Sequence, residues 1–176
     1  FRWGAMINDE LDALKDMPER LGRAARRSEE KFVTALFIDA NGPHASFYTS
    51  GNKNIVNTTN GASATNPALS ISALQDAFKV LSKMVDENGE PIVIDTVELV
   101  VPPALEVTAY NIQNAVQLWL DTNASAGTAQ QNLVTTNWMK ARLNINVNPY
   151  IPIVASSANG NTSWALFANP NNGRPA

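Results

Sequence analysis

The sequence predicts an α+β fold, in which helices surround a small β-sheet, and three observations support this. Residues 18–39 form a long run of charged and helix-favouring residues. Residues 70–85 carry apolar side chains at spacings of three and four, which is typical of a helix with one buried face. Short runs rich in valine, isoleucine and leucine, at 96–101 and 142–151, indicate strands.

The composition limits both the size of the fold and its chemistry. The chain has 176 residues, of which 44% are apolar and 16% charged, enough for one ordinary core or two small lobes. Its net charge of -3 argues against a protein whose main role is to hold a polyanion, since nucleic-acid affinity rests largely on neutralised phosphates. The lack of cysteine excludes disulfides, zinc–thiolate sites and cysteine nucleophiles. No apolar run approaches the length of a membrane span.

The chain begins with a predicted strand and then becomes helical. Residues 1–6 are expected to form the end of a strand, with Phe1 and Trp3 on one side. Asn8 is a suitable N-cap for a short helix that follows. Because proline is tolerated in the first turn of a helix and is costly inside one, we expect a kink or a new start at Pro18.

The helix predicted over residues 18–39 has a narrow apolar stripe and charged remaining faces. The stripe consists of Leu21, Ala25, Ser28, Phe32 and Leu36. Three oppositely charged i,i+4 pairs accompany it, namely Asp16 with Arg20, Glu19 with Arg23, and Arg26 with Glu30. So thin a stripe buries little area for so long a helix. We therefore expect its other faces to be solvated or to contact another chain.

A long loop is predicted over residues 39–69, and a helix follows it. The loop is rich in glycine and asparagine, and its apolar anchors are Phe47, Tyr48, Ile55 and Val56. Loops of this length in a compact domain tend to be functional or mobile. Ser70 or Ser72 is expected to cap the next helix. Its inward side chains are predicted to be Ile71, Leu74, Phe78, Leu81 and Val85, and Gly89 and Pro91 follow its end.

The last third of the chain is predicted to contain a buried strand, a helix and two further strands. Residues 96–101 form the strand, and a helix is expected over residues 104–120. Its inward side chains would be Leu105, Ala109, Ile112, Val116, Trp119 and Leu120. After a flexible segment at 121–132, two strands joined by a turn around Asn159 and Gly160 are expected. Leu143, Ile145 and Val147 mark the buried face of the first of these strands.

Four arginines on the long helix are the strongest candidate binding residues: Arg20, Arg23, Arg26 and Arg27. Arginine binds phosphate through a bidentate fork, so a nucleic-acid-binding module is one interpretation. Interleaved glutamates dilute the charge, and no aromatic platform lies beside the cluster for base stacking. The second interpretation is a salt-bridged face, within or between subunits. On that basis these four arginines, with Glu19 and Glu30, are the candidate subunit-interface residues.

No motif predicts a catalytic, cofactor or metal site. Ser28 and Lys31 match the Ser-x-x-Lys spacing of penicillin-binding enzymes, but the partner motifs of those enzymes are missing. His44 has no paired acid or second ligand near it in the sequence and is interpreted as a surface loop residue. The protein is therefore predicted not to be an enzyme and to need no cofactor.

Six segments, taken in order, resemble a known family: FRWGAMINDELDALKDMPERLGRAARRSEEKFV, YTSGNKNI, LSISALQDAFKVL, VELVVPPALEVTA, LNINVNPYIP and WALFANP. Together they resemble the major capsid proteins of tailed bacteriophages with the HK97 fold, in particular the Mu-like major head subunit, often fused to a prohead protease. The resemblance covers nearly the whole chain and depends on the order of the segments. One departure is that Ser50-Gly51-Asn52 stands where many relatives have His-Gly-Asn.

The resemblance implies a fragment of a two-domain capsid subunit. Residues 1–69 would comprise the end of the extended loop, the long spine helix and the following loop, all in the peripheral domain. Residues 70–176 would comprise the axial domain, with helices around a small central sheet, and the start of the return to the peripheral domain. Such subunits form pentamers and hexamers of an icosahedral head that encloses the DNA genome.

The partners implied are copies of the same chain, with scaffold or prohead protease, portal and decoration proteins. Packaged DNA would be touched only non-specifically, and no membrane is involved. The expected location is the virion, after assembly in the bacterial host cytoplasm. An encapsulin-like nanocompartment shell protein, a hydrolase using Ser28 and Lys31, and the nucleic-acid-binding module remain as alternatives.

Overall fold

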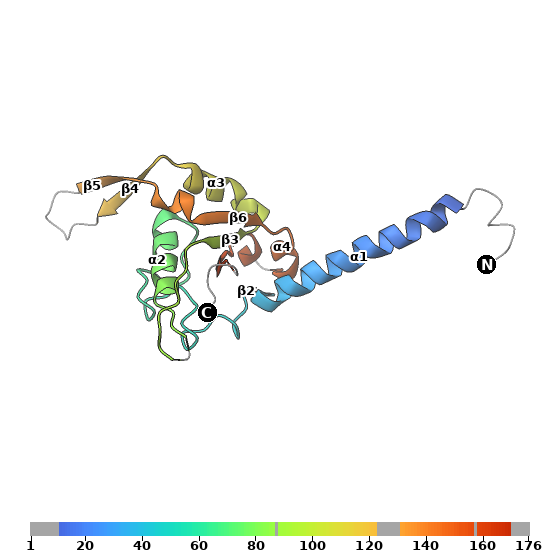
Figure 1. Cartoon of the computed structure of the whole chain (residues 1–176), viewed down its shortest axis with the longest axis horizontal. Helices are drawn as coiled ribbons and strands as arrows, with labels where there is room; N and C mark the ends of the chain where they lie inside the picture. Colours follow the sequence, from blue (N-terminus) through green and yellow to red (C-terminus); the bar gives the residue numbers. More distant parts are fainter. Residues whose placement is uncertain (1–10, 87, 123–130, 157, 170–176) are drawn as a thin grey trace.

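A computed structural model describes residues 11–86, 88–122, 131–156 and 158–169. A long helix extends away from a compact body, and a β-hairpin projects from the body at the opposite end (Figure 1). The elements are α1 (Leu11–Phe37), β1 (Ile38–Asp39), β2 (Gly42–Pro43), α2 (Ile71–Ser82), β3 (Val97–Val101), η2 (Pro103–Leu105), α3 (Glu106–Asn114), β4 (Gln117–Thr122), β5 (Gln131–Thr136), η3 (Trp138–Ala141), β6 (Leu143–Val147), α4 (Ile151–Val154), η4 (Ala158–Asn161) and β7 (Ala165–Ala168). The mixture of helices and small sheets confirms the predicted α+β class.

The long helix α1 is continuous, so the prediction of a break at Pro18 is wrong. Pro18 lies inside the 27-residue helix. Proline removes one backbone hydrogen bond, and the strong helix formers on both sides of it sustain the rest of the helix. The helix ends at Phe37, two residues earlier than expected. The strand predicted over residues 1–6 and the Asn8 cap lie outside the described residues.

A three-stranded sheet forms the centre of the body, in the order β6-β3-β7. The central strand β3 pairs parallel to β6, with Leu99 opposite Ile145, and antiparallel to β7, with Leu99 opposite Leu166. The prediction that β6 and β7 are joined by a turn is wrong, because α4 and η4 connect them and β3 lies between them. The valine-rich β3 is buried on both faces, as expected for a central strand.

The two faces of this sheet carry separate apolar clusters. One face packs against α2 and α3 through side chains that include Leu74, Phe78, Leu99, Ala109, Ile112 and Leu143. The other face packs against the end of α1 and against α4 through Ile38, Val100, Ile151 and Ala155, with Phe37 and Phe167 partly buried beside them. The rings of Phe37 and Phe167 meet edge to face at 5.3 Å. This second cluster joins α1 to the body.

The helix α2 begins where the sequence predicted and ends earlier. Ser70 is the N-cap, and its hydroxyl accepts a hydrogen bond from the Ala73 N–H at 3.2 Å. The helix stops at Ser82. Val85, which was predicted to face inward, therefore lies beyond the helix and is 47% exposed.

The helix predicted over residues 104–120 is only partly correct. The structure has the short η2 and then α3, which ends at Asn114. Residues 117–122 instead form β4, which pairs antiparallel with β5. Parts of the segment predicted to be flexible are therefore strand, and Val116, which was predicted to be buried, is 79% exposed. The side chains of Trp119 and Leu120 lie outside the described set.

Candidate assembly surfaces

The charged side chains of α1 form the three ion pairs that the sequence predicted. Arg20 lies 3.5 Å from Asp16, Arg26 lies 3.8 Å from Glu30, and Arg23 pairs with Glu19. Every one of these side chains is at least half exposed. Arg27 is exposed on the same helix. Exposed pairs contribute at most about 1 kcal/mol each, so they add only modestly to the stability of the helix.

The apolar stripe of α1 (Leu21, Ala25, Ser28, Phe32 and Leu36) faces away from the body. Leu21 is 73% exposed, Phe32 67% and Leu36 57%. The buried residue at this end of the helix is Thr34, whose hydroxyl accepts a hydrogen bond from Asn148 Nδ2 at 3.0 Å. At about 100° per residue, Thr34 lies on the side of the helix opposite Phe32 and Leu36. The body therefore leaves the stripe uncovered, and most of α1 extends beyond the body (Figure 1).

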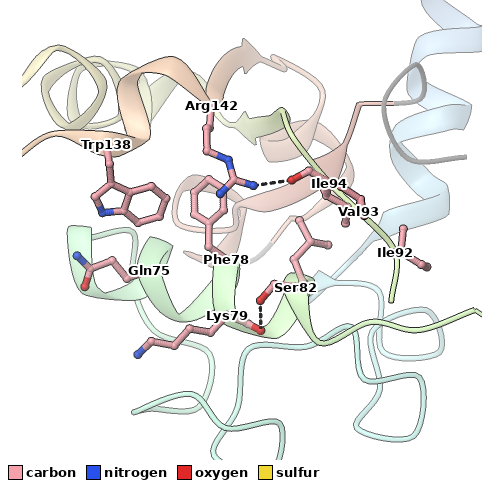
Figure 2. Close-up of a pocket in the computed structure, with 10 residues that line it drawn as sticks. Gln75, Phe78, Lys79, Ser82, Ile92, Val93, Ile94, Trp138 and Arg142 are labelled. Carbon is pink, nitrogen blue, oxygen red and sulfur yellow. Dashed lines mark hydrogen bonds between the residues drawn. The ribbon is translucent and has the colours of Figure 1, made fainter. Parts of the chain in front are cut away.

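A groove beside α2, here the Trp138 groove, is lined by Phe78, Val93, Ile94, Trp138 and Arg142 and has a volume of about 480 Å³ (Figure 2). The Trp138 and Phe78 rings meet at 5.1 Å. The Arg142 guanidinium lies over the Phe78 ring, and its Nε donates a hydrogen bond to the Asp95 carbonyl at 2.8 Å.

Arg142 also donates to the Ile94 carbonyl, so its guanidinium serves to fix the segment that leads into β3. Val93 is 72% exposed and Trp138 is 42% exposed at the rim of the groove. The Trp138 groove therefore has a structural role within the body, and its rim is apolar. The sequence did not indicate it, because Val93 and Trp138 come from distant segments.

A larger hollow, here the β7 hollow, lies along β7 and has a volume of about 720 Å³. Its apolar lining includes Phe47, Tyr48, Ile55, Val56, Val80 and Leu166. The four apolar anchors predicted in the long loop therefore share one cavity, which the sequence alone did not indicate. The Tyr48 hydroxyl is buried and has no hydrogen-bond partner among the described residues. Burial raises the pKa of Tyr48.

The long loop that forms one wall of this hollow is fixed to the body by a few polar contacts. Asp76 of α2 accepts hydrogen bonds from the Ser63 N–H at 2.7 Å and from the Lys79 ammonium at 2.9 Å. Burial alone would raise the pKa of Asp76, but these contacts outweigh it and hold the pKa below its usual range. The Trp164 indole donates to the Pro67 carbonyl at 3.1 Å.

The residues considered for catalysis have local structural contacts. The Ser28 hydroxyl donates to the Ala24 carbonyl of its own helix at 3.1 Å. His44 Nδ1 accepts a hydrogen bond from the Ser46 N–H at 3.3 Å. Hydrogen bonds from the Asn41 and Ala45 N–H groups lower the pKa of Asp39.

Within the described ranges, no group of three or more histidine or acidic side chains could hold a metal ion. The same ranges contain no helix that could span a membrane.

One family of known proteins matches almost the whole chain. The family model described as "Phage capsid protein" matches residues 3–176. The chain belongs to this family of phage capsid proteins. No curated protein and no solved structure matches the chain. Membership supports a structural role in the virion and self-assembly with other capsid subunits.

Proposed function

We propose that this capsid protein is a shell subunit with the HK97 fold, of the Mu-like major head type, that assembles into pentamers and hexamers of an icosahedral head. The observation that carries the proposal is the outward-facing apolar stripe of α1. Phe32 and Leu36 stay more than half exposed although the body lies next to that end of the helix. In a shell, the neighbouring subunit covers such a stripe.

The two predicted regions have different parts in this proposal. Residues 1–69 would contribute the end of the extended loop, the spine helix α1 and the following loop to the peripheral domain. Residues 70–176 would form the axial domain around the β6-β3-β7 sheet and begin the return. The rigid α1 then acts as a strut whose stripe and charged faces contact neighbouring copies.

The arginine–carboxylate pairs of α1 would select the partner and its register. Arg20, Arg23 and Arg26 already pair within α1, so they retain unused donors that a neighbouring carboxylate can accept. Charged rims of this kind influence specificity and association rate more than affinity. Packaged DNA would be confined with only non-specific contact, consistent with the net charge of -3.

Other components of a phage head are part of the proposal. Scaffold or prohead protease, portal and decoration proteins would act on the assembled shell. Assembly would take place in the bacterial host cytoplasm. The identity of the chain as a phage capsid protein motivates these partners.

The test is sedimentation and negative-stain electron microscopy of the protein expressed without other phage genes. We expect closed particles, or rings with fivefold and sixfold symmetry. A monomer that persists at high protein concentration, and that gives no larger species when scaffold or protease is added, would contradict the proposal.

A further inference from the structure

We propose that Asn88 is a site of spontaneous deamidation, at the Asn88-Gly89 step of the turn between α2 and β3. Its side-chain amide is lost as ammonia, and the residue becomes aspartate or isoaspartate. Three observations carry this inference: the side chain is exposed, no side-chain hydrogen bond restrains it among the described residues, and the structure restrains the other Asn-Gly steps that it describes. All the reacting atoms of the protein belong to one chain, so the reaction is independent of the proposed assembly.

The reaction needs only the chain and water. The backbone nitrogen of Gly89 attacks Cγ of Asn88, and a new carbon–nitrogen bond forms as the bond from Cγ to Nδ2 breaks. The side-chain nitrogen takes up the proton that the Gly89 nitrogen loses and leaves as ammonia, which completes a succinimide ring. Water then opens the ring: attack at Cγ gives aspartate, and attack at the backbone carbonyl carbon of residue 88 gives isoaspartate. Glycine favours the first step because it has no Cβ to obstruct its nitrogen.

The same dipeptide occurs at several places in the chain. Four of these steps lie within the described ranges: Asn41-Gly42, Asn60-Gly61, Asn88-Gly89 and Asn159-Gly160. A fifth, Asn172-Gly173, lies outside those ranges. The attack requires the asparagine side chain to turn toward the next nitrogen and the peptide group between them to rotate. Hydrogen bonds and close packing that oppose either movement protect a step, so the structure ranks the four.

The Asn88-Gly89 step has the fewest restraints. Both residues are exposed. The Asn88 backbone N–H donates to Asp86 Oδ1 at 2.8 Å, but its side-chain amide has no hydrogen-bond partner among the described residues. The Gly89 N–H donates to the Asp86 carbonyl at 3.1 Å, and a Cβ added to Gly89 would meet nothing within 4 Å. The peptide group therefore has room to rotate once a single exposed backbone bond breaks.

At the Asn60-Gly61 step the side chain is restrained as well as the backbone. Asn60 Nδ2 donates to the Ile55 carbonyl at 2.8 Å. The Gly61 N–H donates to the Thr58 carbonyl at 3.2 Å. Both bonds must break before the Gly61 nitrogen can reach Cγ of Asn60. The additional side-chain bond should slow the reaction roughly 2- to 10-fold relative to Asn88.

The two remaining described steps restrain each other. Asn159 Nδ2 donates to the Asn41 carbonyl at 2.7 Å, so one bond fixes the Asn159 side chain and the peptide group that follows Asn41. Gly42 and Gly160 are both buried. A Cβ added to Gly160 would clash with the Ala155 carbonyl oxygen, which shows how closely this backbone is packed. Rotation of either peptide group would disturb the packing around it, and we expect both steps to react more slowly than Asn60-Gly61.

Deamidation changes the charge and the geometry of the turn. Asp86 Oδ1 accepts hydrogen bonds from the N–H groups of Asn88 and Glu90, each at 2.8 Å. A carboxylate at position 88 adds a negative charge beside the acidic residues Asp86 and Glu90, and like charges repel. Isoaspartate also adds a carbon atom to the backbone between the hydrogen-bonded groups. Each modified copy therefore has one more negative charge and a weaker turn.

The test is peptide mapping by mass spectrometry of the full chain during incubation in a mildly alkaline buffer. The buffer is made with heavy-oxygen water, so residues that react during the incubation incorporate the label and differ from those modified beforehand. A parallel sample contains guanidinium chloride, which removes the structural restraints. The matched variant is Asn88→Gln, which keeps a side-chain amide but would have to close a six-membered ring, a much slower reaction.

In the folded protein we expect Asn88 to react first, with a mass gain of about one dalton before the label is counted and a mixture of aspartate and isoaspartate. The rates of the four steps should converge in guanidinium chloride. Asn88→Gln should remove the fast reaction and leave the other steps and the circular dichroism unchanged.

Two results would overturn the proposal. In the first, another of the four described steps reacts as fast as Asn88 in the folded protein, or faster. In the second, Asn88 stays intact in the folded protein while the denatured chain reacts. Neither result would affect the proposed function, because sedimentation and electron microscopy of freshly prepared protein test assembly separately.

Discussion

Replacing the apolar stripe of α1 by polar residues should abolish association while leaving the subunit folded. Leu21, Phe32 and Leu36 are 73%, 67% and 57% exposed. Complete burial of such a side chain contributes about 1.5–3 kcal/mol, so covering the exposed part contributes about 1–2 kcal/mol for each residue. The three together contribute about 3–6 kcal/mol to each contact, equivalent to an affinity change of about 100- to 20,000-fold.

The variant to make is Leu21→Gln/Phe32→Gln/Leu36→Gln, because glutamine has nearly the helix propensity of leucine. Its circular dichroism should match that of the natural protein, while sedimentation shifts to the monomer. The matched control is Leu21→Met/Leu36→Met, which keeps the stripe apolar and should still associate. Unchanged association of the glutamine variant would refute the argument that the stripe is a contact surface.

Three further predictions concern the body of the subunit. Asn137→Ala should lower the free energy of unfolding by about 2–4 kcal/mol in urea melts, because the buried amide donates to three carbonyls at the end of α3. The isosteric Asn137→Asp also loses these donors and should be no more stable than Asn137→Ala. Because the folded-state pKa of Asp76 is lowered, its contribution is present at neutral pH and is lost as the pH falls below 3.8 and through the folded-state pKa. The stability difference between the natural protein and Asp76→Asn should therefore shrink in acid, and a pH-independent difference would contradict the role of the charge. In thermal melts, Gly160→Ala should destabilise the protein by about 1–3 kcal/mol, because the added Cβ would clash with the Ala155 carbonyl oxygen. The control Gly22→Ala should be neutral or stabilising, because nothing lies within 4 Å of the added Cβ.

The elements that the sequence predicted well are those with one strong local pattern. The start of α2 follows from the Ser70 cap, and β3 follows from its buried valines. Residues 116–120 were misassigned because the run fits both periods: Val116, Trp119 and Leu120 have helical spacing, whereas Val116, Leu118 and Leu120 alternate as in a strand. The pairing of β4 with the following strand β5 decided for strand. A local pattern cannot supply that information.

The sequence likewise predicted some features of the candidate surfaces and not others. The ion pairs of α1 were predictable, because residues four apart are neighbours on any helix. The direction of the apolar stripe was not, since it depends on the Thr34–Asn148 contact, which joins residues 114 positions apart. The β7 hollow likewise needs the long loop, α2 and β7 to be brought together.

The helix α1 is attached to the body at its C-terminal end, so a small rotation there produces a large displacement of its far end. Among the described side chains of α1, those that contact the body lie in the last turns, around Thr34 and the Phe37–Phe167 ring pair. For a rigid arm of about 40 Å, a rotation of about 10° at this pivot displaces the far end by about 7 Å. A small change in the packing of α1 against the second cluster is thus enough to redirect the far end of the arm, while the cluster between the sheet and α2 and α3 stays unchanged.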